Sequence, residues 1–268
     1  MKNILFIGLG HMGSSLVKGI LANDTFDAKV YGHDAFKELQ DKVVNSLDKL
    51  SALNNLEEIV SNNIDVIVIG TRPDAVDSLC SDLDKLDLNG KTIVCMANAV
   101  DIERLETNFK NQKDLTIIRM MPNMNASLRE SVTAIAYKKA DKEKLDFVIE
   151  MFKCCGIVEI VEEDKFGTLT AISGCLPSYV ISFFKAITDY AVEKGFEKDQ
   201  AFRIVETAII GSIKNSANSN VELRTMVDQI CVPNGSTIEG QNVLDSEGFE
   251  ELIKKCLSAA EKKATPNK

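Results

Sequence analysis

The chain has 268 residues, of which 45% are hydrophobic and 26% charged, as in ordinary soluble globular proteins. Its net charge of −9 argues against a nucleic-acid or anionic-membrane partner held by a basic surface. The seven cysteines form no disulfide or metal-binding pattern, and the two histidines, His11 and His33, both lie near the start of the chain. We therefore expect free thiols, no metal site and no Ser-His-Asp triad in the second half. No uninterrupted apolar run is long enough to span a membrane, and we therefore expect a cytoplasmic protein with no membrane partner.

Strand and helix patterns alternate from Ile4 to Val161. Short apolar runs predict strands at residues 4–7, 29–31, 66–69, 92–96, 116–120, 133–136 and 157–161. Amphipathic stretches between them predict helices at residues 12–22, 36–44, 56–60, 75–83, 102–109 and 142–154. This alternation indicates an α/β fold with a doubly wound, mostly parallel sheet covered by helices on both faces.

The pattern changes near Asp164, after which only helical periodicity is found. Helices are predicted at residues 178–194, 198–217, 221–230, 237–244 and 249–263, with a disordered tail over 262–268. Pro177 suits the first turn of the long helix, and Gly195 suits its end. That helix is apolar over much of its circumference, which is typical of a helix buried between subunits. We expect a first domain over residues 1–163 and an all-helical domain over 164–268.

The first strand runs directly into the motif GLGHMG, in which glycines at positions 8, 10 and 13 fit the pattern G-x-G-x-x-G. Gly8 permits the tight turn, Gly10 lets a diphosphate approach the backbone, and Gly13 allows close packing of the following helix. Because the motif joins a strand to a helix at the start of a β-α-β unit, it predicts a dinucleotide-binding domain of the Rossmann type.

The end of the second strand bears on which dinucleotide is bound. Asp34 stands about 20 residues after the glycines and is placed to accept the ribose hydroxyls, which favours NAD over NADP. His33 or Lys37 remains an alternative partner for a 2′-phosphate, and His33 and Asp34 also suit an ordinary turn. His11 is expected to fill a loop position and not to act as a base.

Three further segments carry groups suited to ligand binding. Thr71-Arg72-Pro73 follows one buried strand, and Met121-Pro122-Asn123 follows another. Both segments would lie at the carboxyl edge of the sheet, where such folds bind ligands. The loop CVPNGSTI at residues 231–238 runs into a helix, and its backbone N–H groups and two hydroxyls suit a small carboxylate. Each segment alone is also compatible with a plain loop.

The order of five motifs, GLGHMG, DVIVIGTRP, MPN, TAISGCLPSYV and VDQICVPNGSTIEG, resembles the pyrroline-5-carboxylate reductase family over nearly the whole chain. The resemblance implies hydride transfer from NADH or NADPH to the C=N carbon of 1-pyrroline-5-carboxylate, giving L-proline. It also implies a homodimer or larger assembly formed through interleaved C-terminal helices.

The resemblance further implies roles for individual residues. The cofactor would be bound by Gly8, Leu9, Gly10, His11, Met12, Gly13, His33, Asp34, Thr71, Arg72, Pro73, Ala97, Asn123 and Gln229. The substrate would be bound by Ser173, Gly235, Ser236 and Thr237. Thr237 would act in catalysis by hydrogen-bonding the ring nitrogen, and no metal is implied.

This chain departs from the family pattern at two glycine positions, where it has Leu176 and Asn234. Asn tolerates a left-handed backbone at modest cost, whereas Leu176 adds bulk beside the substrate pocket. A reductase of a different imine is therefore an alternative. A β-hydroxyacid dehydrogenase is another, although Lys185 is followed three residues later by Thr188 where that family has Asn. A non-catalytic nucleotide-sensing regulator on the same scaffold is a third.

Overall fold

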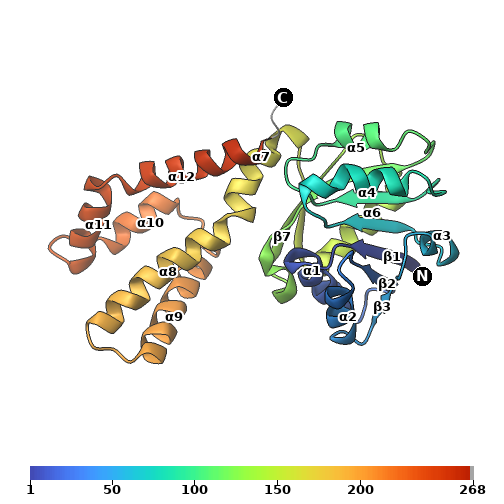
Figure 1. Cartoon of the computed structure of the whole chain (residues 1–268). Coiled ribbons are helices and arrows are strands. Elements are labelled where there is room, and N and C mark those ends of the chain that lie inside the picture. Colours follow the sequence, from blue (N-terminus) through green and yellow to red (C-terminus); the bar gives the residue numbers. More distant parts are fainter. Residues whose placement is uncertain (266–268) are drawn as a thin grey trace. The chain divides into compact units, whose positions relative to one another are not determined.

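The computed structural model describes residues 1–265 and divides the chain into two compact units (Figure 1). The first unit comprises Met1–Cys175 together with the segment that begins at Ala260, and the second comprises Leu176–Ala259. The expected domain boundary at residue 163 therefore differs from the division between the compact units, which falls at Cys175.

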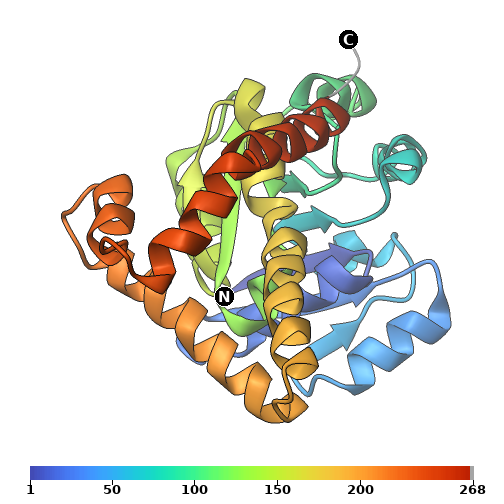
Figure 2. The ribbon, with the colours of Figure 1, turned by 90° about the vertical axis from the view of Figure 1, so that its left-hand side faces the viewer.

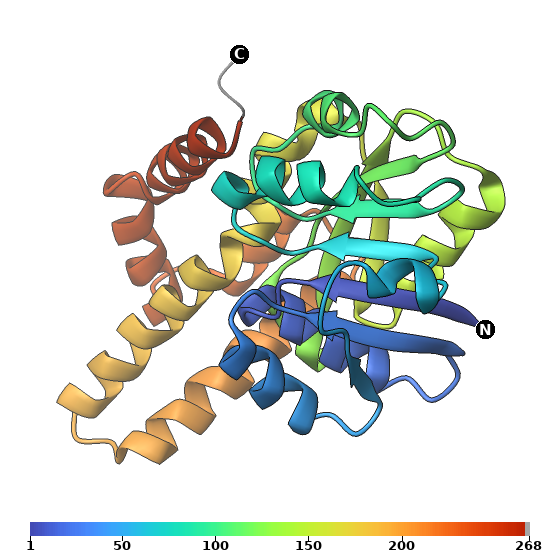
Figure 3. The ribbon, with the colours of Figure 1, turned by 45° about the vertical axis from the view of Figure 1, so that its right-hand side comes forward.

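The first unit is built on one eight-stranded sheet (Figure 3). In the order β3-β2-β1-β4-β5-β6-β7-β8, its strands are Leu50–Ala52, Ala28–His33, Lys2–Ile7, Val66–Ile69, Thr92–Cys95, Thr116–Met121, Ser131–Tyr137 and Gly156–Ile160. Strands β1 to β6 are parallel, whereas β7 runs antiparallel to β6 and β8 runs parallel to β7. The chain order reverses between β1 and β4, and the carboxyl ends of strands at such a reversal form the usual ligand crevice of this fold.

Helices cover both faces of this sheet, as predicted. On one face, the buried side chains of β1, β4 and β5 pack with those of α3 (Glu58–Ser61), α4 (Val76–Leu83) and α5 (Ile102–Asn108). On the other face, they pack with α1 (His11–Leu21), α2 (Lys37–Asn45) and α6 (Lys142–Lys153). All four side chains of β4 are buried, because a parallel strand in the middle of a doubly wound sheet has helices on both sides.

A helical segment after β8 stays with the sheet unit and explains the late unit boundary. It consists of a 3₁₀ turn at Glu163–Lys165, α7 at Phe166–Leu169 and a π-helical turn, η4, at Thr170–Gly174. Phe166 is fully buried, and the guanidinium of Arg119 lies 4.6 Å from the centre of its ring. Glu163 Oε1 accepts hydrogen bonds from Arg119 Nη1 at 3.1 Å and from the backbone N–H of Ile102 at 2.8 Å. These contacts attach the segment to the sheet.

The second unit is helical, as predicted. Its helices are α8 (Leu176–Glu193), α9 (Lys198–Ala217), α10 (Leu223–Ile230), α11 (Ser236–Ser246) and α12 (Phe249–Ala264), the last of which continues into the first unit. Helices α8 and α9 form a hairpin joined at one end (Figure 2), in which Phe184 and Phe202 make an edge-to-face contact at 4.8 Å. The chain reverses between them at Gly195, whose φ of +95° suits glycine.

Much of the surface of α8 is exposed. Among its described residues, Thr188 alone is buried, while Ile181, Phe183 and Tyr190 are half or more exposed. Within residues 1–265, the helical stretch Glu163–Glu193 also contains an 18-residue window with a mean hydropathy of 1.3, so it is long and apolar enough to cross a membrane by length and composition. The sequence did not predict this stretch, because its apolar residues do not form one uninterrupted run. The core helix of a soluble protein passes the same test, so this property alone is weak evidence for a membrane span.

One strand was missed in the sequence, and one prediction about local structure was wrong. Strand β3 at Leu50–Ala52 was not predicted, because three residues with one buried side chain are too few to show a strand pattern. Residues 262–264 of the expected disordered tail belong to α12, whose amphipathic face continues to the buried Ala264. The last part of that tail, residues 266–268, lies outside the described residues.

Candidate active site

The glycine motif forms the turn between β1 and α1. Gly8 has a φ of +99°, and a Cβ there would lie 2.7 Å from the backbone of Gly70 at the end of β4. A Cβ on Gly13 would lie only 2.0 Å from the carbonyl oxygen of Gly8, so this glycine is required for α1 to pack against the turn. A Cβ on Gly10 would meet nothing within 4 Å. The three glycines thus have the separate steric roles that a diphosphate-binding turn requires.

The remaining residues of the motif have different surroundings. Leu9 is buried, and its side chain lies under β2, where a Cβ on Gly32 would approach it to 2.9 Å. His11 is exposed as the first residue of α1, and Met12 is half-buried. Gly10 occupies the N-cap position of α1 with no side-chain cap, which leaves the helix N-terminus open to an anion.

Asp34 follows β2 and is fixed by backbone donors. Its Oδ2 accepts the N–H of Leu9 at 2.7 Å, and its Oδ1 accepts the N–H of Phe36 at 2.9 Å. The alternative phosphate partners also have contacts of their own: His33 Nδ1 lies 2.9 Å from the carbonyl oxygen of Leu53, and Lys37 Nζ lies 2.9 Å from Asp41 Oδ1. Asp34 therefore holds the glycine turn through its hydrogen bond from Leu9. The two residues are 25 positions apart, and the sequence did not reveal this contact.

The carboxyl ends of the next two strands bring Thr71, Arg72, Pro73 and Ala97 to the same edge of the sheet. The hydroxyl oxygen of Thr71 is buried with no hydrogen-bond partner among the described residues. Arg72 and Pro73 are exposed, and Arg72 forms an ion pair with Asp74 at 3.2 Å. Ala97 is buried after β5. The orphaned hydroxyl of Thr71 is the kind of group that a bound polar ligand would satisfy.

A buried polar pair follows β6. Asn123 is 5% exposed and Ser173 is 7% exposed, and Asn123 Nδ2 lies 3.5 Å from Ser173 Oγ. Asn123 Oδ1 also accepts the N–H of Asn125 at 3.2 Å, which fixes the orientation of the amide. Ser173 belongs to the π-helical turn, a distortion often found at functional sites. Sequence reasoning selected both residues but assigned them to different ligands, and the structure places them side by side.

The remaining predicted residues lie in the second unit. The loop before α11 contains Asn234 in a left-handed conformation, with a φ of +61°, as its substitution for glycine predicted. Gly235 is the N-cap of α11 and contributes no side-chain cap, so Ser236 and Thr237 form its exposed first turn. Because Gly235 occupies the N-cap position, Thr237 does not cap this helix. Gln229 is exposed on α10.

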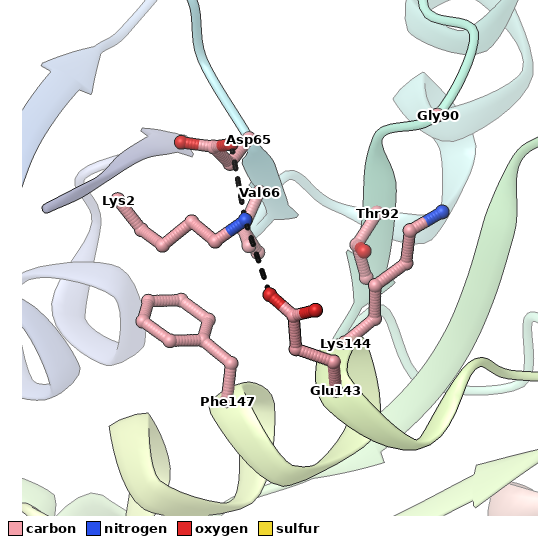
Figure 4. A pocket seen from close by; sticks show the side chains of 8 residues that line it. All are labelled: Lys2, Asp65, Val66, Gly90, Thr92, Glu143, Lys144 and Phe147. Carbon is pink, nitrogen blue, oxygen red and sulfur yellow. Dashed lines mark ion pairs between the residues drawn. The ribbon is translucent and has the colours of Figure 1, made fainter.

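The opposite edge of the sheet has a small cavity of about 40 Å³ at the amino ends of β1, β4 and β5 (Figure 4). The ammonium of Lys2 lies between two carboxylates there, 3.6 Å from Asp65 Oδ1 and 3.9 Å from Glu143 Oε1. The cavity has room for water but not for a dinucleotide. This ion-pair cluster therefore joins the strands to α6 and is separate from the ligand-binding edge.

The cysteines are free thiols, as predicted. Burial raises the pKa of Cys80 to about 12 and that of Cys95 to about 11, and it raises the pKa of Cys155 to about 12. These thiols stay protonated at neutral pH and are poor nucleophiles. Among the described residues, no group of three or more His, Cys, Asp or Glu side chains is arranged to hold a metal ion.

The sheet topology and the glycine turn define a dinucleotide-binding oxidoreductase fold with an added helical unit. Residues 163–266 match the family described as pyrroline-5-carboxylate reductase dimerisation, and residues 3–99 match the family of coenzyme F420-dependent NADP oxidoreductases. The chain is 30% identical to pyrroline-5-carboxylate reductase of Aquifex aeolicus over 77% of both chains. The chain belongs to the pyrroline-5-carboxylate reductase family.

Similarity to this family extends over the full length. The reductase of Escherichia coli is 28% identical over 97% of this chain and 98% of its own. Among solved structures, the Plasmodium falciparum enzyme with NADP bound superposes with a TM-score of 0.85 at 25% identity, covering 98% of this chain and 97% of that chain. The Streptococcus pyogenes enzyme superposes with a TM-score of 0.88 at 25% identity over the same shares of the two chains. The match to a dimerisation family accounts for the exposed apolar surface of α8 by self-association.

Proposed function

We propose that this protein reduces the C=N bond of 1-pyrroline-5-carboxylate to give L-proline, with NADH or NADPH as the reductant. The observation that carries this proposal is the juxtaposition of an open glycine turn, an unpartnered Thr71 hydroxyl and the buried Asn123–Ser173 pair. These groups follow β1, β4 and β6, so they lie along one edge of a parallel sheet. Full-length similarity to curated reductases of this substrate supports the same assignment.

The residues present fit a nicotinamide dinucleotide. Gly10 leaves open space beside the first turn of α1, whose free N–H groups and helix dipole favour a diphosphate. The ribose hydroxyls would meet Asp34, and Thr71–Pro73, Ala97 and Asn123 would hold the nicotinamide end. The bound nicotinamide supplies the hydride.

The substrate carboxylate would bind the N-terminus of α11. Gly235 has no side chain to cap this helix, so the first-turn N–H groups and the helix dipole remain available to an anion. Ser236 adds a hydroxyl donor beside them. The hydroxyl of Thr237 would hydrogen-bond the ring nitrogen and orient the C=N bond for hydride transfer.

The chemistry asks for orientation more than for a strong acid. A protonated cyclic imine accepts a hydride at carbon, and the electron pair of the C=N bond becomes the amine lone pair of proline. Positioning by the carboxylate site and Thr237 therefore supplies much of the rate enhancement. The chain has only two histidines, His11 and His33, and both lie near the predicted cofactor site, so the loop before α11 has no histidine to act as an acid.

We also propose that the active form is at least a homodimer in the cytoplasm, with the interface in the second unit. The support is the exposed apolar surface of α8 and α9, which includes Ile181, Phe183 and Ile213. Surface of this extent is unusual on a monomer. Ile213→Glu, at a side chain that is 65% exposed, should shift the light-scattering mass toward the monomer while the helical content is retained. A monomeric parent protein at micromolar concentration would refute the proposal.

The β-hydroxyacid dehydrogenase alternative is less favoured. It requires a catalytic lysine on the long helix, but Lys185 is exposed and paired with Asp189 on the same helix. The hydrogen bond from Lys185 to Asp189 raises the pKa of this lysine, which makes the ammonium a weaker acid. A different imine substrate would follow from Leu176, and a nucleotide-sensing regulator would bind the cofactor without turnover.

One experiment separates these functions. Oxidation of NADH and NADPH is followed at 340 nm with pyrroline-5-carboxylate, with the isomeric pyrroline-2-carboxylate, with the six-membered homologue and with a β-keto acid. We expect the highest kcat/KM with pyrroline-5-carboxylate. A higher kcat/KM with another imine or with the keto acid would refute the substrate assignment, and cofactor binding without any turnover would identify a regulator.

A further inference from the structure

Asn98 lies just after β5, at the edge of the sheet where folds of this kind bind ligands. The register pairs Ile69 of β4 with Cys95 of β5, so the segments that follow these two strands leave the sheet side by side. Successive side chains at the end of β5 alternate between the two faces: Cys95 and Ala97 belong to one core cluster and Met96 to the other. This alternation places Asn98 on the same face as Met96.

The side chain of Met96 shows which part of the site this face borders. Its methyl carbon lies 3.8 Å from the position of a Cβ on Gly13 and 2.2 Å from the position of a Cβ on Gly70. Met96 therefore lies against the glycine turn. Because two residues advance an extended chain by about 6.6 Å, Asn98 lies further along this face, past the carboxyl end of the strand.

The amide of Asn98 is held by the backbone of the next residue. Asn98 Oδ1 accepts the N–H of Ala99 at 3.0 Å. A backbone N–H can only donate, so this bond turns the amide oxygen toward Ala99 and the NH2 group away from it. Ala99 has a φ of +56°, a left-handed conformation that is costly for alanine. Strained backbone of this kind is concentrated at ligand-binding and active sites.

The NH2 group of Asn98 is a donor that the fold does not use. Within residues 1–265, Asn98 Nδ2 has no hydrogen-bond partner, and the residue is only half-buried, so this donor remains open to a ligand. A dinucleotide in this fold lies across the point where the strand order reverses, with its adenosine half over β1 and β2. The nicotinamide half therefore lies over β4 and β5. On the nicotinamide ring, the carboxamide carries the hydrogen-bonding atoms, and its oxygen is the acceptor.

We infer that Asn98 binds the nicotinamide ring of the cofactor, by donating a hydrogen bond from Nδ2 to the carboxamide oxygen. This bond limits rotation of the ring and so helps to present one face of it to the substrate. The inference rests on the proposed function only in that it takes a nicotinamide dinucleotide as the ligand.

The test compares NADH with ADP-ribose, which lacks the nicotinamide ring and keeps the rest of the molecule. Both Kd values are measured by calorimetry at about 0.15 M salt. Asn98→Asp keeps an oxygen for the N–H of Ala99 but replaces the NH2 donor with an acceptor. The ratio of the Kd for NADH to that for ADP-ribose should rise at least about fivefold, while Tm stays close to that of the parent protein. The added charge acts on the diphosphate of both ligands, so its effect cancels from the ratio.

Two further variants separate the ligand contact from the turn. Asn98→Ala removes both hydrogen bonds, so it should raise the ratio by a similar factor and also lower Tm. Asn89→Asp makes the same chemical change before the amino end of β5, where Asn89 Oδ1 accepts the N–H of Lys113 at 3.1 Å, and it should leave the ratio unchanged. A parental ratio together with a parental Tm in Asn98→Asp would show that the amide serves the turn alone, and it would overturn the inference.

A change in the ligand tests the same bond without any variant. Thio-NADH carries sulfur, a weak acceptor, in place of the carboxamide oxygen. The parent protein should bind thio-NADH about fivefold more weakly than NADH, and this difference should be lost in Asn98→Ala. Equal Kd values for the two ligands in the parent protein would overturn the inference, whatever the variants do.

These outcomes are independent of the proposed reaction. If the ratio rises in Asn98→Asp but no imine is reduced by the parent protein, the proposed function fails and the inference stands. If the imine is reduced and the ratio stays at the parental value, only the inference fails.

Discussion

Alanine at Gly13 should destabilise the fold, whereas alanine at Gly10 of the same motif should weaken cofactor binding. A Cβ on Gly13 would lie 2.0 Å from the carbonyl oxygen of Gly8, whereas a Cβ on Gly10 would meet nothing within 4 Å. Gly13→Ala should therefore force α1 away from the turn and destabilise the fold. Gly10→Ala should leave the fold nearly unchanged but place a methyl group where the diphosphate must approach.

The magnitudes follow from the steric difference. Overpacking of this kind costs about 1–3 kcal/mol, and for a chain of this size that lowers Tm by roughly 2–12 °C. At Gly10 the loss of a good N-cap residue costs about 0.5–1 kcal/mol of stability. A misfit of about 1–3 kcal/mol against the diphosphate raises the Kd for NADH by roughly 5- to 150-fold.

Both variants are compared with the parent protein by thermal unfolding and by calorimetric titration with NADH at one protein concentration. We expect Gly13→Ala to lose more stability than Gly10→Ala, and Gly10→Ala to lose affinity while its Tm stays close to that of the parent. Parental NADH affinity in Gly10→Ala would show that the diphosphate does not lie at this turn. A parental Tm in Gly13→Ala would refute the packing argument.

Three other predictions address catalysis, backbone strain and pH. Thr237→Ala should lower kcat/KM for pyrroline-5-carboxylate by about 10- to 150-fold at parental NADH affinity. Thr237→Ser keeps the hydroxyl and should retain most activity. An equal loss in both variants would contradict a role of the hydroxyl. Ala99 has a φ of +56°, which is strained for alanine. Ala99→Gly should therefore raise the free energy of unfolding, measured in urea, by up to about 1 kcal/mol, whereas Ala136→Gly in β7 should lower it. The reverse order would refute strain at Ala99. In the folded state the pKa of Cys80 is about 12 and that of Cys95 about 11, whereas the ordinary value is 9.0. Above pH 9 the folded state therefore binds more protons than the unfolded state. The free energy of unfolding should fall there by about 1.4 kcal/mol per pH unit for each thiol. Urea unfolding at pH 8 and 10 measures this slope, which Cys80→Ala should reduce; an unchanged slope would contradict it.

The sequence predicted the features of the fold that depend on local patterns. The buried runs of β1 and β4 and the amphipathic helices of both units have clear periodicities, and the observed elements lie close to the predicted ranges. The π-helical turn at Thr170–Gly174 was not predicted, because its apolar spacing is that of an ordinary helix. The unit boundary at Cys175 also depends on a tertiary contact, the packing of Phe166 beneath Arg119, which no local pattern reports.

The candidate site shows the same division. The glycine roles followed from the strand-motif-helix context, and the left-handed backbone of Asn234 followed from its place in a glycine loop. The pairing of Asn123 with Ser173 joins positions 50 residues apart, and the bond from Leu9 to Asp34 joins positions 25 residues apart. Such contacts exist only once the sheet has formed, so the sequence identified these residues without revealing how they act on one another.

The most direct test of the central claim is the stoichiometry of the reaction. The parent protein is incubated with NADH and pyrroline-5-carboxylate, and the NADH oxidised at 340 nm is compared with the L-proline formed, measured by chiral chromatography. The account predicts one L-proline for each NADH, and a rate that falls at least about tenfold in Thr237→Ala. Absence of L-proline from a protein that is folded and binds NADH would contradict the account.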